Sequence, residues 1–335
     1  MEHRKLTRYL ISLMMILIMV GLAEWTNEKE ILFPEMTALI IGLLIIDKRV
    51  WNVKRWQIIL LMTLGAVAGI CIVRYSPLPY VVNLCAAFVF AGASLLISRA
   101  TLVPLISACV LPVLLHTESI IYPIAVFSMS VSVVLVQIIL EKCGIRNRMP
   151  KSVCRKPVKE DIIRWLILFC FVGALAGLAV SMDYPYLILP PLMVTFVEMV
   201  NSKAGFKNRP TQVFLFLATA ATLGTVLQIV GHHHLHLPES IIALTIAAIL
   251  FLIFEWTGKY FAPAGALAFI PMLLPQEGLG WLPLEASIGA ALFITIAMVV
   301  FQKCYKWNRA QLIFCATPTL LREYMNRKKR KKQIE

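Results

Sequence analysis

The chain alternates long apolar stretches with short polar segments. The apolar stretches cover 8–25, 33–46, 56–74, 79–98, 102–117, 119–140, 164–182, 187–200, 211–230, 238–256, 262–275 and 283–302. The hydrocarbon core of a bilayer is about 30 Å thick and needs roughly 20 helical residues. The pattern therefore predicts an all-α polytopic membrane protein with about twelve transmembrane segments, some of them short.

The composition agrees with this prediction and excludes other classes. Of the 335 residues, 59% are apolar and 15% are charged, whereas soluble domains have about 45–50% and about 25%. A soluble enzyme, a disordered protein and a nucleic-acid module are thus excluded for the whole chain. The net charge of +14 does not indicate a nucleic-acid partner, because the basic residues fall between the apolar stretches.

The positions of the basic residues predict an orientation. Threading twelve crossings places 30 of the 32 Lys and Arg residues on one side of the membrane, and only Lys29 and Arg74 on the other. Because Lys and Arg remain cytoplasmic, we expect a multi-pass protein of the cell membrane with both termini in the cytoplasm. The basic tail 319–335 is expected to touch anionic lipid.

The two halves of the chain resemble each other. Pro34 corresponds to Pro190 at an offset of 156, Pro104 to Pro263 at 159, and Cys143 to Cys304 at 161, with further matches at each offset. The series predicts two parallel six-span repeats, 1–157 and 158–318, related by an axis along the membrane normal.

Part of the second half resembles the HPP family of integral membrane proteins, over roughly 186–303. The resemblance is carried by Leu189-Pro190-Pro191-Leu192, Asn208-Arg209-Pro210 and Lys259-Tyr260-Phe261-Ala262-Pro263-Ala264-Gly265-Ala266. The family's His-Pro-Pro-Ala-Gly-Ala signature is degenerate here, since Phe261 stands in place of the His and Ala262 in place of the first Pro. Some members are linked to nitrite transport, so the resemblance implies a small-anion permease.

The second and fifth spans of each half begin with a proline-containing segment. Because proline suits the first turn of a helix and its predecessor prefers an extended backbone, these spans are expected to be discontinuous, with helices of only about 12–14 residues, or about 20 Å. Helix N-termini at the midplane would then bind an anion. The predicted substrate-binding residues are Pro34, Glu35, Pro104, Pro190, Pro191, Pro263, Ala264 and Gly265. Full spans with proline kinks are the alternative.

Other polar residues have two interpretations each. Glu35 is either a proton-coupling carboxylate or a helix-terminal acid near the outer interface. His232 and His236 either share a helical face and bind a metal or lie in a solvated loop. Glu198 and Glu255 either line a vestibule or pair with Lys203 and Lys259. The cytoplasmic cysteines, Cys143, Cys154, Cys304 and Cys315, either hold zinc or are reduced thiols; no metal or cofactor is expected.

The function predicted first is a permease or secondary transporter, not an enzyme, for a small and anionic solute that binds between the two repeats. Membrane lipids and the solute are the expected partners, and a homo-oligomer is compatible with the sequence. The alternatives are a membrane-embedded enzyme with an outer His cluster, and a non-catalytic membrane subunit that docks through its basic face.

Overall fold

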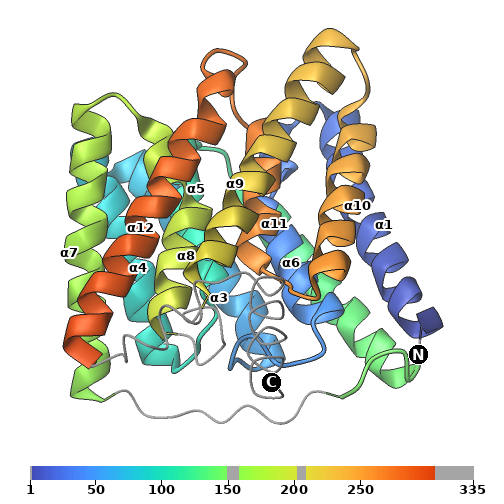
Figure 1. Cartoon of the computed structure of the whole chain (residues 1–335), viewed down its shortest axis with the longest axis horizontal. Helices are drawn as coiled ribbons and strands as arrows, with labels where there is room; N and C mark the ends of the chain where they lie inside the picture. The colour runs from blue at the N-terminus through green and yellow to red at the C-terminus, as the bar shows by residue number, and fades with distance from the viewer. Residues whose placement is uncertain (1, 149–157, 202–208, 306–335) are drawn as a thin grey trace, which may run out of the picture.

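The computed structural model describes residues 2–148, 158–201 and 209–305, and every regular element in these ranges is a helix (Figure 1). Within them, eight helices are long and apolar enough to cross a membrane. They are α1 (Glu2–Thr26), α3 (Arg55–Tyr75), α4 (Tyr80–Ser98), α6 (Ile121–Lys142), α7 (Lys159–Ser181), α9 (Pro210–Leu227), α10 (Glu239–Thr257) and α12 (Leu282–Tyr305).

The other apolar stretches form short helices. These are α2 (Pro34–Ile40), which continues as the π-helical turn η2 (Ile41–Ile45), α5 (Pro104–Leu115), α8 (Pro190–Asn201) and α11 (Ala262–Phe269), which continues as the 3₁₀ turn η6 (Ile270–Met272). The remaining turns are 3₁₀ turns η1 (Lys29–Ile31), η3 (Pro185–Ile188) and η7 (Leu279–Trp281), and the π-helical η5 (Gln228–His234).

The short helices begin at the prolines, as the sequence predicts. Proline is the first or second residue of α2, α5, α8 and α11, and α5 and α8 have 12 residues each, about 18 Å at 1.5 Å per residue. Phe33, which precedes Pro34, is extended, whereas Ala262, which precedes Pro263, is already helical and the extended residue is Phe261 before it. The prediction is wrong at Val103, which has φ −61° and ψ −30°, because its N–H donates to the Thr101 carbonyl in a turn.

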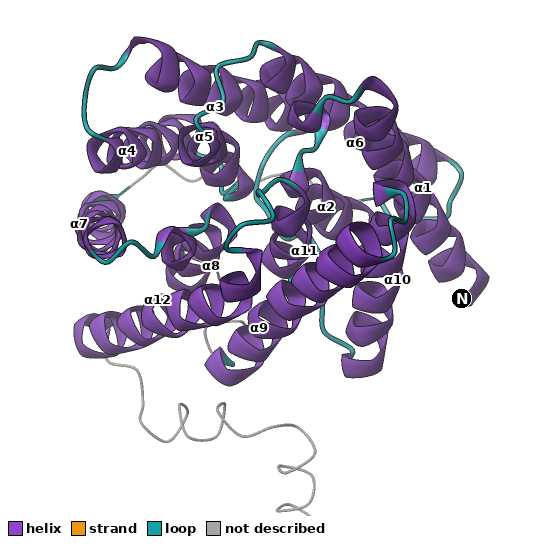
Figure 2. Cartoon of the chain, turned by 90° about the horizontal axis from the view of Figure 1, so that it is seen from above, coloured by secondary structure: helices purple, strands orange, loops and turns teal. Residues whose placement is uncertain are grey.

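Burial separates the two classes of helix. Every residue of α2, η2, α11 and η6 is buried, and Figure 2 shows α2, α8 and α11 enclosed by the long helices. The long helices instead present apolar side chains outward, such as Ile18 (59% exposed), Leu252 (68%) and Trp256 (86%). A buried apolar interior combined with an apolar exterior is the arrangement of an integral membrane protein.

The molecule has two distinct ends. The N-terminus lies at the lower end in Figure 1. There, Arg8 of α1 pairs with Asp47, and Arg55 of α3 pairs with Glu141 at the end of α6. We call this the basic end; it contains the connecting segments 46–54, 99–103, 143–148 and 258–261. The opposite end contains 27–33, 76–79, 116–120, 182–189, 235–238 and 273–281.

Helices of the first half pack against helices of the second half. Helix α1 packs against α10 and α7 against α4, while α2 packs against α11 and α8 against α5. Each of these contacts joins an element of residues 2–148 to one of 158–305, and Figure 2 shows the pairs side by side. Inside each half, α3 packs against α5 and α9 against α11. The short helices are therefore held by both halves at once.

Candidate functional site

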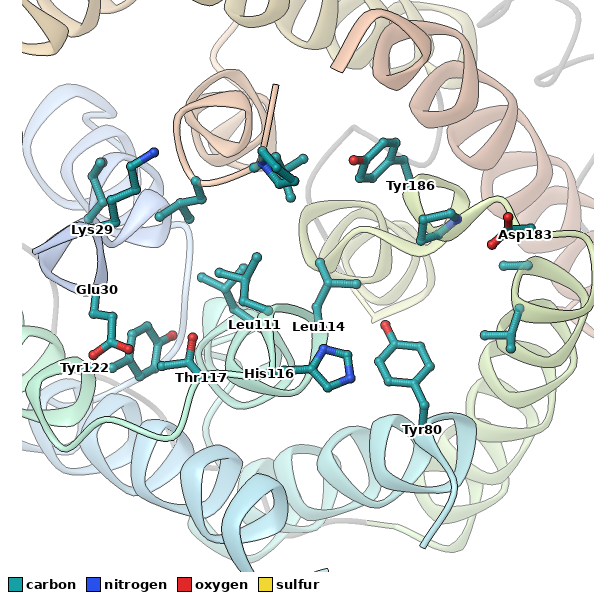
Figure 3. A pocket seen from close by; sticks show the side chains of 18 residues that line it. Lys29, Glu30, Tyr80, Leu111, Leu114, His116, Thr117, Tyr122, Asp183 and Tyr186 are labelled. Atoms are coloured by element: carbon teal, nitrogen blue, oxygen red, sulfur yellow. The ribbon is translucent and has the colours of Figure 1, made fainter. Parts of the chain in front are cut away.

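A cavity of about 540 Å³ opens at the opposite end of the molecule (Figure 3). Its wall contains the end of α5 and residues next to the ends of the other short helices. Leu32 precedes α2, Leu111 and Leu114 lie at the end of α5, Tyr186 precedes α8, and Leu273 follows η6. The cavity thus lies where the two halves meet, and its volume is that of a pocket for a small molecule.

Aromatic side chains from both halves face this cavity. Tyr80, the first residue of α4, stacks on His116 with ring centroids 5.4 Å apart. His116 follows the last residue of α5 with a left-handed backbone (φ 52°), which turns the chain and places the ring beside Tyr80. From the other half, Tyr186 is held by its backbone N–H, which donates to the Glu285 carboxylate of α12 at 3.1 Å.

Charged groups of both signs line the cavity. Lys29 and Glu30 come from η1, and Asp183 follows α7. Figure 3 shows Lys29 and Glu30 on one side, with Asp183 on the other. One Glu30 oxygen, Oε2, is buried and has no hydrogen-bond partner among the described residues. The lining is otherwise mostly apolar, so a ligand would meet polar groups at a few points only.

Beneath the cavity, Glu35 lies fully buried at the start of α2 (1% exposed). The Ser107 hydroxyl, in the first turn of α5, donates to its Oε1 atom. The next residue of α5, Ala108, accepts a hydrogen bond from the Tyr122 hydroxyl at 3.1 Å. Tyr122 also lines the cavity, so it connects the cavity wall to the part of α5 that contacts Glu35.

The predicted substrate-binding residues are all buried in the first turns of the short helices. Glu35 meets the first turn of α5, so the starts of α2 and α5 are brought together. The start of α11 instead faces the junction of α2 and η2, where a Cβ on Gly265 would lie 2.4 Å from Ile41 and 3.2 Å from Thr37. None of the predicted residues lines the cavity, and their role in binding stays a prediction.

A second buried carboxylate lies toward the basic end. Glu198 of α8 (4% exposed) accepts a hydrogen bond from the Trp51 indole nitrogen at 3.1 Å. The Trp51 ring packs against Gly42 of η2, where a Cβ would approach it to 2.4 Å. Segment 46–54 therefore inserts a large ring between a short helix of each half. Lys203, the partner expected for Glu198, lies outside the described residues.

Polar side chains at the basic end form a network. Glu255 of α10 pairs with Lys5 at 3.0 Å rather than with the expected Lys259, because α1 and α10 pack side by side. The Tyr260 hydroxyl also donates to Glu255 at 2.6 Å. Burial raises the pKa of Tyr260, and the contact with Glu255 adds to this shift. In the loop after α6, burial and the neighbouring Arg8 lower the pKa of Arg146 to about 10, so its guanidinium is charged at neutral pH.

Of the two interpretations of the histidines, the structure does not show the helical pair. Helical geometry ends with the π-helical η5 at His234, and His236 has a left-handed backbone (φ 51°). His232 instead contacts the Leu237 carbonyl at 3.2 Å and lies 3.7 Å from Glu239. No group of three metal-binding side chains occurs in the described part of the chain.

The four cysteines that correspond between the halves are only partly within the structure. Cys143 is exposed and free. Cys154, Cys315 and the basic tail 319–335 lie outside the described residues, and for Cys304 only the backbone is described. The interpretation of these thiols stays a prediction.

Sequence reasoning missed the groups that surround the cavity and Glu35. Ser107 and Tyr122 are polar residues inside predicted spans, and that property was the available signal. Tyr80, His116 and Tyr186 lie at helix ends in three separate elements, and the sequence alone did not indicate that these ends meet. Comparison of the chain with family models, with curated proteins and with solved structures gives no match.

Proposed function

We propose that this membrane protein is a permease or secondary transporter, not an enzyme, whose solute passes between two parallel six-span halves. The observation that carries the proposal is the cavity of about 540 Å³, to which both halves contribute and whose wall contains the end of α5 and residues next to the ends of α2, α8 and η6. Transporters commonly place the binding site at a repeat interface, between discontinuous helices. The contacts between the halves occur in matching pairs, α1 with α10 and α7 with α4, and this supports a parallel duplication.

Closure on the basic side fits alternating access. Trp51 and its hydrogen bond to Glu198 fill the space between η2 and α8, while the cavity opens at the other end. By the positive-inside rule, the basic end is cytoplasmic. We assign this arrangement to a state that receives solute from outside the cell.

We propose an anion as the solute because of the helix starts in the second half. In the second half, the starts of α8 and α11 carry Pro191, Ala264 and Gly265 and no acidic side chain, so neither helix start has a carboxylate of its own to neutralise its partial positive charge. The cavity wall itself mixes Lys29 with Glu30 and Asp183 and does not select a charge. The resemblance to the HPP family points the same way, toward small anions such as nitrite.

Uptake into liposomes tests the proposal. The purified chain is reconstituted and offered labelled nitrite, nitrate, chloride, formate and, as cationic controls, rubidium and methylammonium. Leu114→Trp fills the cavity, and Leu60→Trp on the lipid-facing side of α3 (47% exposed) is the matched control. We expect uptake of at least one anion, its loss in Leu114→Trp and its retention in Leu60→Trp. The absence of uptake across the panel, or equal uptake by both variants, would refute the proposal.

A further inference from the structure

We infer that Glu35 is a proton-binding site that receives its proton from the cavity by way of Tyr122. The binding of the proton stands on the structure alone; its coupling to solute movement rests on the proposed permease function. The argument has four steps, which concern the charge of Glu35, its neighbours, the route to it and the species bound.

The first step is that Glu35 lacks a positive partner. Its Oε1 atom accepts a hydrogen bond from the neutral Ser107 hydroxyl, and its Oε2 atom is buried with no hydrogen-bond partner among the described residues. A carboxylate taken out of water without a counter-charge is unstable and is neutralised by a proton or a cation. The contact with Ser107 survives protonation, because a carboxyl group can donate to a hydroxyl oxygen.

The second step concerns the ionisable groups around Glu35. Tyr122 from α6 interacts with Glu35, and Cys109 from α5 interacts with Tyr122. Helix α11 contains no ionisable residue, and neither does the segment 10–23 of α1. Neither a phenol nor a thiol becomes positive, so none of these neighbours neutralises the carboxylate.

The third step is the route. Tyr122 lines the cavity, and its hydroxyl donates to the Ala108 carbonyl of α5. Glu35 accepts from Ser107, the residue before Ala108, so both side chains contact the same turn of α5. Glu30 lies on the same side of the cavity as Tyr122 in Figure 3, and η1, which carries it, packs against α6. The unpartnered Oε2 of Glu30 is therefore a proton acceptor in the cavity wall, and Tyr122, which lines the same cavity and interacts with Glu35, links that wall to Glu35.

The fourth step selects a proton over a metal ion. Hard cations such as Mg²⁺ or Ca²⁺ require about six oxygen ligands. In the part of the chain that the structure describes, Ser107 supplies the one side-chain oxygen bonded to Glu35. The facing helix α11 offers alanine, glycine, proline, leucine and phenylalanine side chains, none of which has a ligand atom.

Infrared difference spectroscopy of the reconstituted full chain, between acid and alkaline pH, tests proton binding directly. A buried protonated carboxyl group has a C=O stretch that disappears when the proton leaves. We expect Glu35→Gln to remove one such component and the matched variant Glu198→Gln to retain it. Ser107→Ala removes a donor to the charged form, so the same component should persist to higher pH. A Glu35→Gln spectrum identical to that of the wild type overturns the inference.

Coupling is tested with the liposomes already described, using whichever anion the panel shows to be taken up. An acid-outside gradient should drive its accumulation in the wild type. Glu35→Gln should lose gradient-driven accumulation, and gradient-driven accumulation by this variant overturns the coupling. If no solute is taken up while the infrared component of Glu35 is present, the permease proposal fails and the proton site stands.

Discussion

The close approach of α9 to α11 allows a quantitative test of the packing that positions the second pair of short helices. Gly224 of α9 lies against the backbone of Ala268, and a Cβ built on Gly224 would be 2.1 Å from the Ala268 carbonyl oxygen. Ordinary contacts of this kind begin near 3.4 Å. The helices must therefore separate by roughly 1 Å to admit one methyl group, in an interior that is close-packed. Small residues commonly serve this purpose between membrane helices.

We predict that Gly224→Ala destabilises the protein by about 1–3 kcal/mol, the usual range for overpacking. The matched control is Gly177→Ala in α7, where a Cβ meets nothing within 4 Å; alanine should stabilise that helix by about 0.5–1 kcal/mol. The unfolding midpoint in detergent, followed by tryptophan fluorescence, should fall for Gly224→Ala and stay level or rise for Gly177→Ala. Equal midpoints for the two variants would refute the role assigned to the α9–α11 contact.

Three further predictions concern the basic end. Trp51→Phe keeps an aromatic ring but leaves the buried Glu198 carboxylate without the indole donor, which should lower the free energy of unfolding by about 1–3 kcal/mol. The control Trp56→Phe, at a 58% exposed position, should leave the fluorescence-detected midpoint unchanged. Asp47→Asn removes the charge that pairs with a guanidinium exposed by only 6%, from a carboxylate that is itself 55% exposed, and should cost about 1–3 kcal/mol because it leaves a buried charged donor without its partner. Lys5→Gln breaks a pair in which both side chains are partly exposed and should cost under about 1 kcal/mol. Equal losses in chemical denaturation would contradict this account. In a variant that keeps Cys143 as its single cysteine, a membrane-impermeant maleimide should react in inside-out vesicles and not in intact cells, and labelling of intact cells would reverse the orientation.

The sequence predicted the membrane class and the irregular elements well, because both depend on local properties. Hydropathy alone located the long helices, and the rules for proline located the starts of α2, α5, α8 and α11. The same rules failed at Val103, where a hydrogen bond to Thr101 holds a helical backbone before a proline. Hydropathy did not distinguish a half-length buried helix from a full span, since both are equally apolar.

The site was less predictable, because its groups come together only through contacts between distant elements. Glu35 was identifiable as an acid inside a span, whereas its contact with Ser107 depends on how α2 packs against α5. The partner of Glu255 was predicted from proximity in sequence, and the actual partner, Lys5, is 250 residues away. Of the two interpretations of His232 and His236, the shared helical face fails for a local reason, since η5 is π-helical and ends at His234.

The proposed duplication and the position of Glu35 together constrain the proposed mechanism. The residue that corresponds to Glu35 at the offset of 156 is Pro191, which has no ionisable group. A strictly symmetric pair of halves would bind two protons or none, whereas this chain has one carboxylate at the start of α2 and none at the start of α8. The inference therefore requires that Glu35 contribute a single proton to each transport cycle. A measured ratio of two protons per anion would require a second titrating group, and Glu198, which is buried and already accepts from Trp51, would be the first to test.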